Sequence, residues 1–237
     1  MSRTIPVVLV HGAGQDAEIW DGVTPLLTAP IHVHELPGHG RRGGAPLISI
    51  VAMADDVAAA CPERSVLVGH SMGGAVVLTA AARHPGAVVG VVVVCAALDA
   101  RPDARVLAAL RARSMDAFLP YVRPGIVGFA RAPSPMAEAS ARRLEAVVAR
   151  HPVEVLLADY EAVSASDLTR VLDDVQVPVT VLAGERDALV RPRRVAALAA
   201  AFGVTARIVP GASHQVPWEA PAVVAAAVEE LRTETRG

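Results

Sequence analysis

The stretch Gly69-His70-Ser71-Met72-Gly73 places a serine at the centre of a Gly-x-Ser-x-Gly pattern. The apolar run from Ser65 to Val68 predicts a strand before it, and the small-residue run from Met72 to Arg83 predicts a helix after it. Such a sharp turn strains the backbone of its central residue, and the glycines let strand and helix approach closely. The turn would expose the Ser71 hydroxyl at a strand end and place the Met72 amide at a helix N-terminus. We therefore predict that Ser71 is a nucleophile.

A serine hydroxyl needs a base within hydrogen-bonding distance and a group that orients that base. Parallel sheets place such groups in loops at the carboxyl ends of their strands. Among the eight histidines, His214 lies in a late loop after a predicted strand, which makes it the candidate base. His11, at the end of the first strand, is expected to be structural. His70 is expected to pack, because its side chain must point away from the Ser71 hydroxyl.

The acid that orients the base is expected between Ser71 and His214 in the sequence. Asp187 lies three residues after Gly184, a glycine that lets the chain turn as it leaves a predicted strand. Two alternatives stay open: Asp99, just past another strand, and Glu185, which is closer to the strand end and is expected to cap it or to pair with Arg186. The chain order Ser71, Asp187, His214 is the order of one particular fold.

Donors for the oxyanion of the reaction are expected from backbone amides. The Met72 amide is one. The loop His11-Gly12-Ala13-Gly14 at the end of the first predicted strand supplies the other, from Ala13, because glycines on both sides let this amide turn inward. The alternative is a plain glycine-rich turn. Each such donor typically lowers the barrier by a few kcal/mol.

Composition limits the class of protein. The chain has 237 residues, 53% of them hydrophobic, which suits one large α/β domain or one domain with an insertion. A net charge of -2 suggests neither nucleic acid nor an anionic membrane surface as a partner. Cys61 and Cys95 make no disulfide framework, and Cys95 is expected to be a buried core thiol. Without a signal peptide or an apolar run of ~20 residues, we expect a soluble, cytoplasmic protein with no membrane contact.

Strands and helices alternate in the first half of the chain, which predicts βαβ units and a mostly parallel sheet flanked by helices, an α/β fold. From about Asp99 to about Asp173 only helical patterns occur, and then the alternation resumes. We therefore predict a core of residues 1–98 and 174–237 with a helical insertion at residues 99–173. The predicted strands are Ile5–Val10, His32–Leu36, Ser65–Val68, Val88–Cys95, Val179–Leu182 and Ala206–Val209. The predicted helices are Asp16–Leu27 (broken near Pro25), Ile50–Ala60 with Ser49 as its N-cap, Met72–Arg83, Val106–Arg113, Met115–Tyr121, Met136–Arg150, Val153–Ala165, Arg193–Phe202 and Val223–Leu231.

Five blocks in this order closely resemble the α/β-hydrolase superfamily, in its serine-nucleophile, esterase-like form with a helical cap. They are Val10-His11-Gly12-Ala13-Gly14, Leu36-Pro37-Gly38-His39-Gly40, Gly69 to Gly74, Val177-Pro178-Val179 with Gly184 to Asp187, and Gly211-Ala212-Ser213-His214 with Glu219 and Pro221. The resemblance implies that residues 99–173 form a cap over Ser71. One departure is Glu35, where many relatives carry Asp, and it leaves the catalytic assignment intact.

The resemblance also makes several apolar residues candidates to line an acyl or alcohol pocket. They are Met115, Phe118, Leu119, Tyr121, Ile126 and Phe129 of the cap, with Trp20, Leu189 and Val216 of the core. The alternative is that most of them pack the cap onto the core.

We interpret the sequence as a serine hydrolase that cleaves a carboxylic ester or a related acyl compound, such as a thioester or lactone, through an acyl-enzyme. The substrate is expected to be a small apolar acyl compound, and the chemistry needs no metal or organic cofactor. Because fold does not fix function, other reactions of related triads stay open: carbon–carbon bond hydrolysis, lyase chemistry, cofactor-free oxygenation and perhydrolysis. A non-catalytic small-molecule receptor is a further alternative. A serine nucleophile argues against haloalkane dehalogenase or epoxide hydrolase chemistry, which the resemblance associates with Asp.

Overall fold

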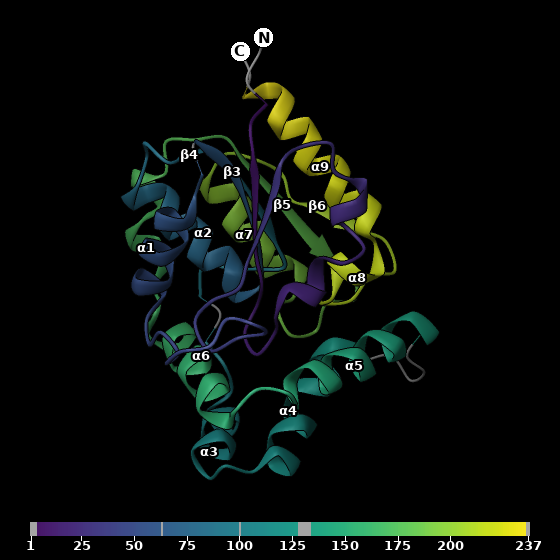
Figure 1. The fold of residues 1–237 in the computed structure, drawn as a ribbon. Helices are drawn as coiled ribbons and strands as arrows, with labels where there is room; N and C mark the ends of the chain where they lie inside the picture. The colour runs from purple at the N-terminus through teal and green to yellow at the C-terminus, as the bar shows by residue number, and fades with distance from the viewer. Residues whose placement is uncertain (1–3, 63, 100, 128–133, 236–237) are drawn as a thin grey trace.

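A computed structural model describes residues 4–62, 64–99, 101–127 and 134–235 of the chain. Six parallel strands form one sheet in the order β2-β1-β3-β4-β5-β6. Helices cover both of its faces, so the predicted α/β fold with a mostly parallel sheet is confirmed (Figure 1). The strands are β1 (Val7–Val10), β2 (Ile31–His34), β3 (Ser65–His70), β4 (Val88–Val94), β5 (Val179–Gly184) and β6 (Arg207–Val209).

Each helix face of the sheet has its own apolar layer. Along β1, Val8 and Val10 face the layer that packs against α1, α2 and α7, whereas Val7 and Leu9 face the layer that packs against α9. All four β1 side chains are fully buried, which explains why the strand is a continuous apolar run. The helices of these layers are α1 (Ile50–Ala60), α2 (Met72–Arg83), α7 (Pro192–Ala201), α8 (Val216–Glu219) and α9 (Pro221–Glu234).

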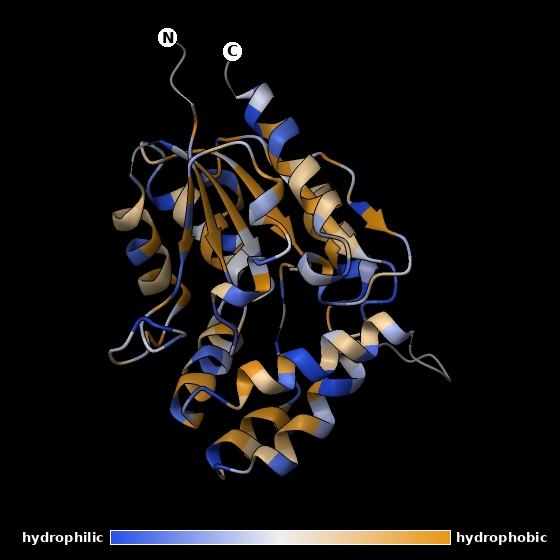
Figure 2. Ribbon diagram, turned by 45° about the vertical axis from the view of Figure 1, so that its right-hand side comes forward, coloured by the Kyte–Doolittle hydropathy of each residue, from blue (hydrophilic) through white to orange (hydrophobic). Residues whose placement is uncertain are grey.

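Four more helices gather at the far end of the molecule from the two termini (Figure 1). They have an apolar cluster of their own, which includes Leu110, Phe118 and Leu156. Figure 2 shows hydrophobic residues (orange) along these helices. All four fall within residues 99–173; the division of the chain at those boundaries stays a prediction. We call these helices the cap: α3 (Ala104–Arg111), α4 (Met115–Val127), α5 (Pro135–Val148) and α6 (Val153–Ala165). None of the helices that the structure describes is long and apolar enough to cross a membrane.

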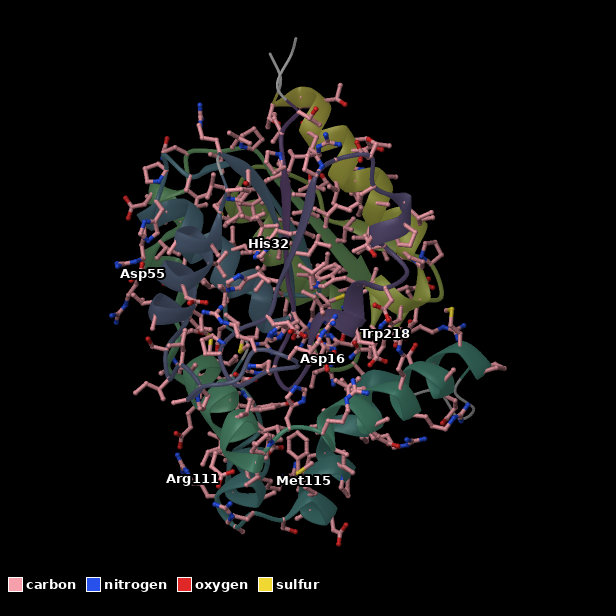
Figure 3. All side chains as sticks on the ribbon, in the orientation of Figure 1. Asp16, His32, Asp55, Arg111, Met115 and Trp218 are labelled. Carbon is pink, nitrogen blue, oxygen red and sulfur yellow. The ribbon has the colours of Figure 1, made fainter. Side chains whose placement is uncertain are left out.

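Ion pairs attach the α5 end of the cap to the core. Arg150 lies 3.0 Å from Asp16, and Arg143 lies 3.0 Å from Glu18. The Arg143 guanidinium also lies over the ring of Trp218, 4.6 Å from its centroid. Asp16 and Trp218 both come from the core, and Figure 3 shows them at the junction with α5.

Some predicted elements differ from the structure. The helix predicted over Asp16–Leu27 is two short 3₁₀ helices, η1 (Ala17–Trp20) and η2 (Thr24–Leu26), consistent with the break expected at Pro25. The short helix α8 was not predicted. Helix α4 continues past Tyr121 through Pro120 and Pro124, six residues beyond its predicted end. The predicted bounds of α1, α2 and α6 are confirmed, and the Ser49 hydroxyl caps α1 by accepting a hydrogen bond from Ala52 N.

The turn between β3 and α2 is very tight. Ser71 has φ 54° and ψ -117°, a strained conformation for a residue with a side chain. A Cβ added to Gly69 would lie 2.1 Å from Gly73 O, and a Cβ added to Gly73 would lie 2.4 Å from Val10 O. Both glycines are therefore required by the close approach of strand and helix, as predicted.

Substitution of Gly69 tests this constraint. Because backbone atoms surround the added Cβ, Gly69→Ala should lower the free energy of unfolding by about 3 kcal/mol. Gly86→Ala is the matched control, since a Cβ at Gly86 meets nothing within 4 Å. Thermal unfolding followed by circular dichroism measures both. Equal melting temperatures for the two variants would contradict the steric account.

Candidate active site

Three side chains from three different strand ends meet at the edge of the sheet that faces the cap. His214 Nε2 lies 3.0 Å from Ser71 Oγ, and His214 Nδ1 lies 2.7 Å from Asp187 Oδ2. Asp187 and His214 are almost completely buried. The carboxylate can only accept, so His214 donates from Nδ1 and its Nε2 can accept the Ser71 proton. The structure therefore brings together the three residues predicted as nucleophile, base and acid.

The Asp187 carboxylate is fixed by its own loop. Its Oδ1 accepts hydrogen bonds from Leu189 N at 2.9 Å and Val190 N at 2.7 Å, which leaves Oδ2 for His214. Gly184 allows this loop to lie against the His214 loop, because a Cβ there would lie 2.0 Å from Ser213 O. The glycine is needed for this close approach of two loops.

The two alternative acids have other partners. Asp99 is exposed and pairs with Arg101 at 3.4 Å. Glu185 accepts a hydrogen bond from Gly211 N at 2.8 Å. Asp187 is therefore the acid whose geometry fits.

Buried polar contacts from Glu219 and His70 hold the His214 loop in place. Glu219 accepts hydrogen bonds from Ser213 N and from Ser213 Oγ. The His70 ring lies 2.8 Å from the His214 carbonyl through Nε2 and 2.9 Å from Gln15 Oε1 through Nδ1. Burial and the neighbouring His214 lower the pKa of His70 to about 3, so its ring is neutral. His70 is fully buried, and it supports the His214 loop by a hydrogen bond rather than by packing alone.

The loop Gly12 to Gly14 lies beside Ser71. Gly12 N donates to Gln15 Oε1 at 3.0 Å, and Gly14 N donates to Asp159 Oδ2 at 2.8 Å. Ala13 lies between these two anchored amides, and it lines the same cavity as Ser71 and Met72. The loop thus has the position that an oxyanion donor requires. His11 is structural, as expected: its Nδ1 lies 2.9 Å from Gly12 O and its Nε2 accepts from Leu36 N.

A cavity of about 410 Å³ opens above Ser71, between the core and the cap. Tyr121 and Leu189, both predicted as pocket residues, line it. Tyr160 and Val163 of α6 also line it, as do three arginines, Arg101, Arg105 and Arg194. Asp103, which pairs with Arg105, lines it too. The cavity is therefore apolar in part and charged in part.

Several predicted pocket residues lie elsewhere. Trp20 and Val216 are fully buried in the core layer under α9, because η1 and α8 turn these side chains toward the sheet. Phe118 packs inside the cap, where its ring meets Tyr160 edge to face at 5.5 Å. Met115 and Leu119 pack against the same cap cluster. These five residues pack within the core or within the cap, and none of them lines the cavity beside Ser71. Phe129 and the side chain of Ile126 lie outside the described residues.

One group of potential metal ligands occurs in the described part of the chain. The ligand atoms of His70, Cys95 and His214 lie within 4.8 Å of one another. Both histidine rings are engaged in the hydrogen bonds given above, so a metal ion would have to displace them. Burial, with the nearby Asp187 charge, raises the pKa of the Cys95 thiol well above its usual value. Cys95 is therefore a buried, protonated thiol, as expected.

The contacts that sequence reasoning missed join residues far apart in the chain. Asp159 contacts Gly14 across 145 positions, and Gln15 contacts Gln215 across 200. Neither Asp159 nor Gln15 lies in a motif with a fixed spacing. The sequence of the helix that contains Asp159 resembled that of any other cap helix. Only His39, in the Pro-Gly-His-Gly loop, pointed to this region.

Comparison with known proteins agrees with this fold. The sequence profile of the Alpha/beta hydrolase family matches residues 7–227. The chain belongs to this family and is a hydrolase enzyme. It is 33% identical over 239 residues to the pimeloyl-(acyl-carrier protein) methyl ester esterase of Sodalis glossinidius (strain morsitans), covering 90% of each chain. It is 35% identical to the protein of the same name from Edwardsiella ictaluri (strain 93-146), covering 88% of this chain and 85% of the relative.

Solved structures share the fold. A thermophilic esterase from Thermogutta terrifontis superposes with a TM-score of 0.85 at 24% identity, covering all of this chain and 92% of the other. At that identity the likeness concerns the fold alone.

The acid can be identified by comparing two substitutions. Asp187→Asn should lower kcat by about 10⁴-fold on a p-nitrophenyl ester, because His214 loses its orienting carboxylate. Asp99→Asn changes the exposed alternative acid, and its kcat should stay close to that of the wild type. Steady-state hydrolysis measures both, and a large loss confined to Asp99→Asn would overturn the assignment.

Proposed function

We propose that the protein is a serine ester hydrolase in which Ser71 is the nucleophile, His214 the general base and Asp187 the residue that orients it. The observation that carries this proposal is the position of His214, within hydrogen-bonding distance of both Ser71 Oγ and Asp187 Oδ2. The cavity above Ser71 supports it, since it gives an acyl compound access to the hydroxyl. The names of the relatives support ester cleavage.

The first half of the reaction forms an acyl-enzyme. Ser71 Oγ attacks the ester carbonyl carbon while its proton passes to His214 Nε2, and the Asp187 carboxylate stabilises the imidazolium. The carbonyl oxygen becomes an oxyanion that the amides of Ala13 and Met72 stabilise. Met72 N is well suited, since it is the first residue of α2, where the helix dipole favours negative charge. The C–O bond then breaks, and the alcohol leaves with the proton from His214.

The second half releases the acid. Water enters, gives its proton to His214 Nε2 and attacks the acyl carbonyl through the same oxyanion site. Collapse of this intermediate breaks the bond to Ser71 Oγ, which takes the proton back. The protein groups end as they began, and this chemistry draws on protein groups and water alone.

For the substrate, we extend the activity of the relatives to this chain: a methyl ester on an acyl chain attached to a carrier protein. The cavity suits it in two ways. Apolar side chains such as Leu189 and Val163 suit an acyl chain. Guanidinium groups, among them Arg194 of α7, suit an anionic group on the carrier or its linker. A cytoplasmic location stays a prediction.

Removal of the nucleophile tests the chemistry. Ser71→Ala should lower kcat on a short p-nitrophenyl ester by about 10⁵-fold or more, because no other group can form the acyl-enzyme. A serine-directed phosphonate should label the wild type at Ser71, as mass spectrometry of peptides would detect. Wild-type protein without turnover and without label would overturn the hydrolase mechanism and favour the receptor alternative.

A comparison of substrates tests the carrier. Pimeloyl methyl ester attached to acyl carrier protein should give a kcat/KM at least about tenfold above free monomethyl pimelate, since the carrier adds contacts that the free ester lacks. Arg194→Gln should reduce this advantage and leave p-nitrophenyl butyrate hydrolysis unchanged. Arg170→Gln is the matched control, because Arg170 is highly exposed and pairs with Asp167. A free ester cleaved as well as the carrier-bound one would contradict the carrier, but not the esterase.

A further inference from the structure

The cap contacts the loop Gly12 to Gly14, which we call the oxyanion loop, at Gly14. Asp159 of α6 is fully buried, and its Oδ2 accepts the Gly14 N–H at 2.8 Å. Gly14 has φ 63°, and a Cβ there would lie 3.2 Å from Leu156 and 3.4 Å from Val148, both cap side chains. A polar contact and apolar packing from the cap therefore converge on the same loop residue.

The same carboxylate oxygen binds a second core loop. His39 Nε2 lies 2.9 Å from Asp159 Oδ2, and His39 Nδ1 lies 3.2 Å from Pro37 O. Both partners are acceptors, and a protonated ring can donate to them from both nitrogens. Burial lowers the pKa of His39, but the hydrogen bond and charge of Asp159 outweigh it, and the pKa is raised. His39 and Asp159 therefore form a buried ion pair.

Other titratable groups surround this pair. The rings of His11 and His151 lie 4.6 Å and 5.4 Å from the His39 ring. Burial and the His39 charge lower the pKa of both, so they are neutral beside the imidazolium. The Asp16 carboxylate of the core raises the pKa of His151, but by less than burial and His39 lower it. His39 is therefore the cation that faces Asp159.

A buried carboxylate is a costly way to hold a cap in place. Asp159 Oδ1 is buried and has no hydrogen-bond partner among the described residues. An unpaired buried acceptor costs about 1–3 kcal/mol, and apolar side chains of similar volume can replace a buried ion pair without loss of stability. The attachment of the cap to the core alone does not explain why a carboxylate is buried here. The need to hold the Gly14 N–H in one direction does explain it.

The amide next to Gly14 is the one that the reaction uses. Gly12 N and Gly14 N are bound to Gln15 and Asp159, whereas Ala13 N has no acceptor among the residues that the structure describes. A Cβ on Gly12 would lie 3.1 Å from Ser71 Cβ, so the loop lies directly beside the nucleophile. With both flanking amides held, the Ala13 N–H is fixed in direction before substrate binds.

We propose that Asp159 is a positioning residue that holds the Ala13 amide in its oxyanion-binding direction, and thereby couples the cap to the chemistry at Ser71. This inference rests on the proposed function. The neighbouring residue on α6, Tyr160, lines the substrate cavity. One helix thus contacts both the substrate site and the oxyanion loop, and a displacement of α6 displaces both.

Kinetics of Asp159 variants test this role. Asp159→Ala should lower kcat on a p-nitrophenyl ester by about 10- to 100-fold with KM changed by less than about threefold, because a misdirected donor affects the transition state. Affinity for a trifluoromethyl ketone, which forms an oxyanion on Ser71, should fall by the same factor as kcat. Asp159→Asn keeps an acceptor for Gly14 N and should recover most of the loss. Asp56→Asn is the matched control, since Asp56 pairs with His34 at 2.8 Å, away from the cavity residues.

The pH dependence of stability gives a second readout. A raised pKa for His39 in the folded state means that its stabilising contribution is present below the usual value and is lost as pH rises through the raised value. The melting temperature of the wild type should therefore exceed that of Asp159→Asn most at about pH 6, and the difference should narrow by about pH 9.

The outcomes separate the two proposals. Absence of phosphonate label on wild-type Ser71 would overturn the proposed function and this inference with it. Normal labelling, with Asp159→Ala kinetically equal to Asp56→Asn, or with a raised KM and an unchanged kcat, would overturn the positioning role alone. If Asp159→Ala does not fold, the trifluoromethyl ketone affinity of His39→Leu decides, because that variant removes the donor that holds the Asp159 carboxylate. Wild-type affinity in that variant would also overturn the positioning role.

Discussion

The backbone of Ser71 is the constraint on which the site depends. Its positive φ is maintained because Ser71 N donates to Val94 O on the neighbouring strand at 2.8 Å and Gly74 N donates to Ser71 O at 2.9 Å. Strand β3 can turn into α2 this abruptly only where glycine backbones lie in contact. The strain of such a residue persists when the surroundings over-determine it, and here two strands and a helix do so. The turn then directs the hydroxyl to the edge of the sheet where β5 and β6 end and their loops begin.

Polar burial around Ser71 follows a consistent rule. The side chains of Asp187, His214, His70, Gln15 and Glu219 are nearly or fully buried, and each has a hydrogen-bond partner given above. Burying a polar group without a partner costs several kcal/mol, so these bonds are what make a polar site inside an apolar fold tolerable. Two successive hydrogen bonds, from Gln15 to Gln215 and from Gly12 to Gln15, also connect the His214 loop to the oxyanion loop. Base and oxyanion donor are therefore held by one network rather than by separate loops.

The parts of this site that were predictable from the sequence are those fixed by local chemistry. The Gly-x-Ser-x-Gly turn, the Ser49 cap and the chain order of the three site residues depend on near neighbours or on strand ends, which a sequence displays directly. The direction of a side chain in an irregular segment does not depend on near neighbours alone, so a sequence does not display it. Trp20 looked like a pocket residue, but η1 packs against β2 and α8 and turns the indole into the core. Its direction is set by a tertiary contact, which no spacing in the sequence encodes.

The cap was least readable for the same reason, and helix geometry makes this concrete. Successive residues on a helix point about 100° apart and residues three apart about 60° apart, so Phe118 and Tyr121 on α4 can still have different surroundings. Phe118 meets Tyr160 inside the cap, whereas Tyr121 lies against the cavity under the Arg105 guanidinium. On α6 the same rotation sends Asp159 to the oxyanion loop and Tyr160 to the substrate. A displacement of α6 as a rigid body would move Tyr160 at the cavity together with Asp159, the acceptor of the Gly14 N–H. Substrate choice and oxyanion geometry are then linked through the rigid body of one helix.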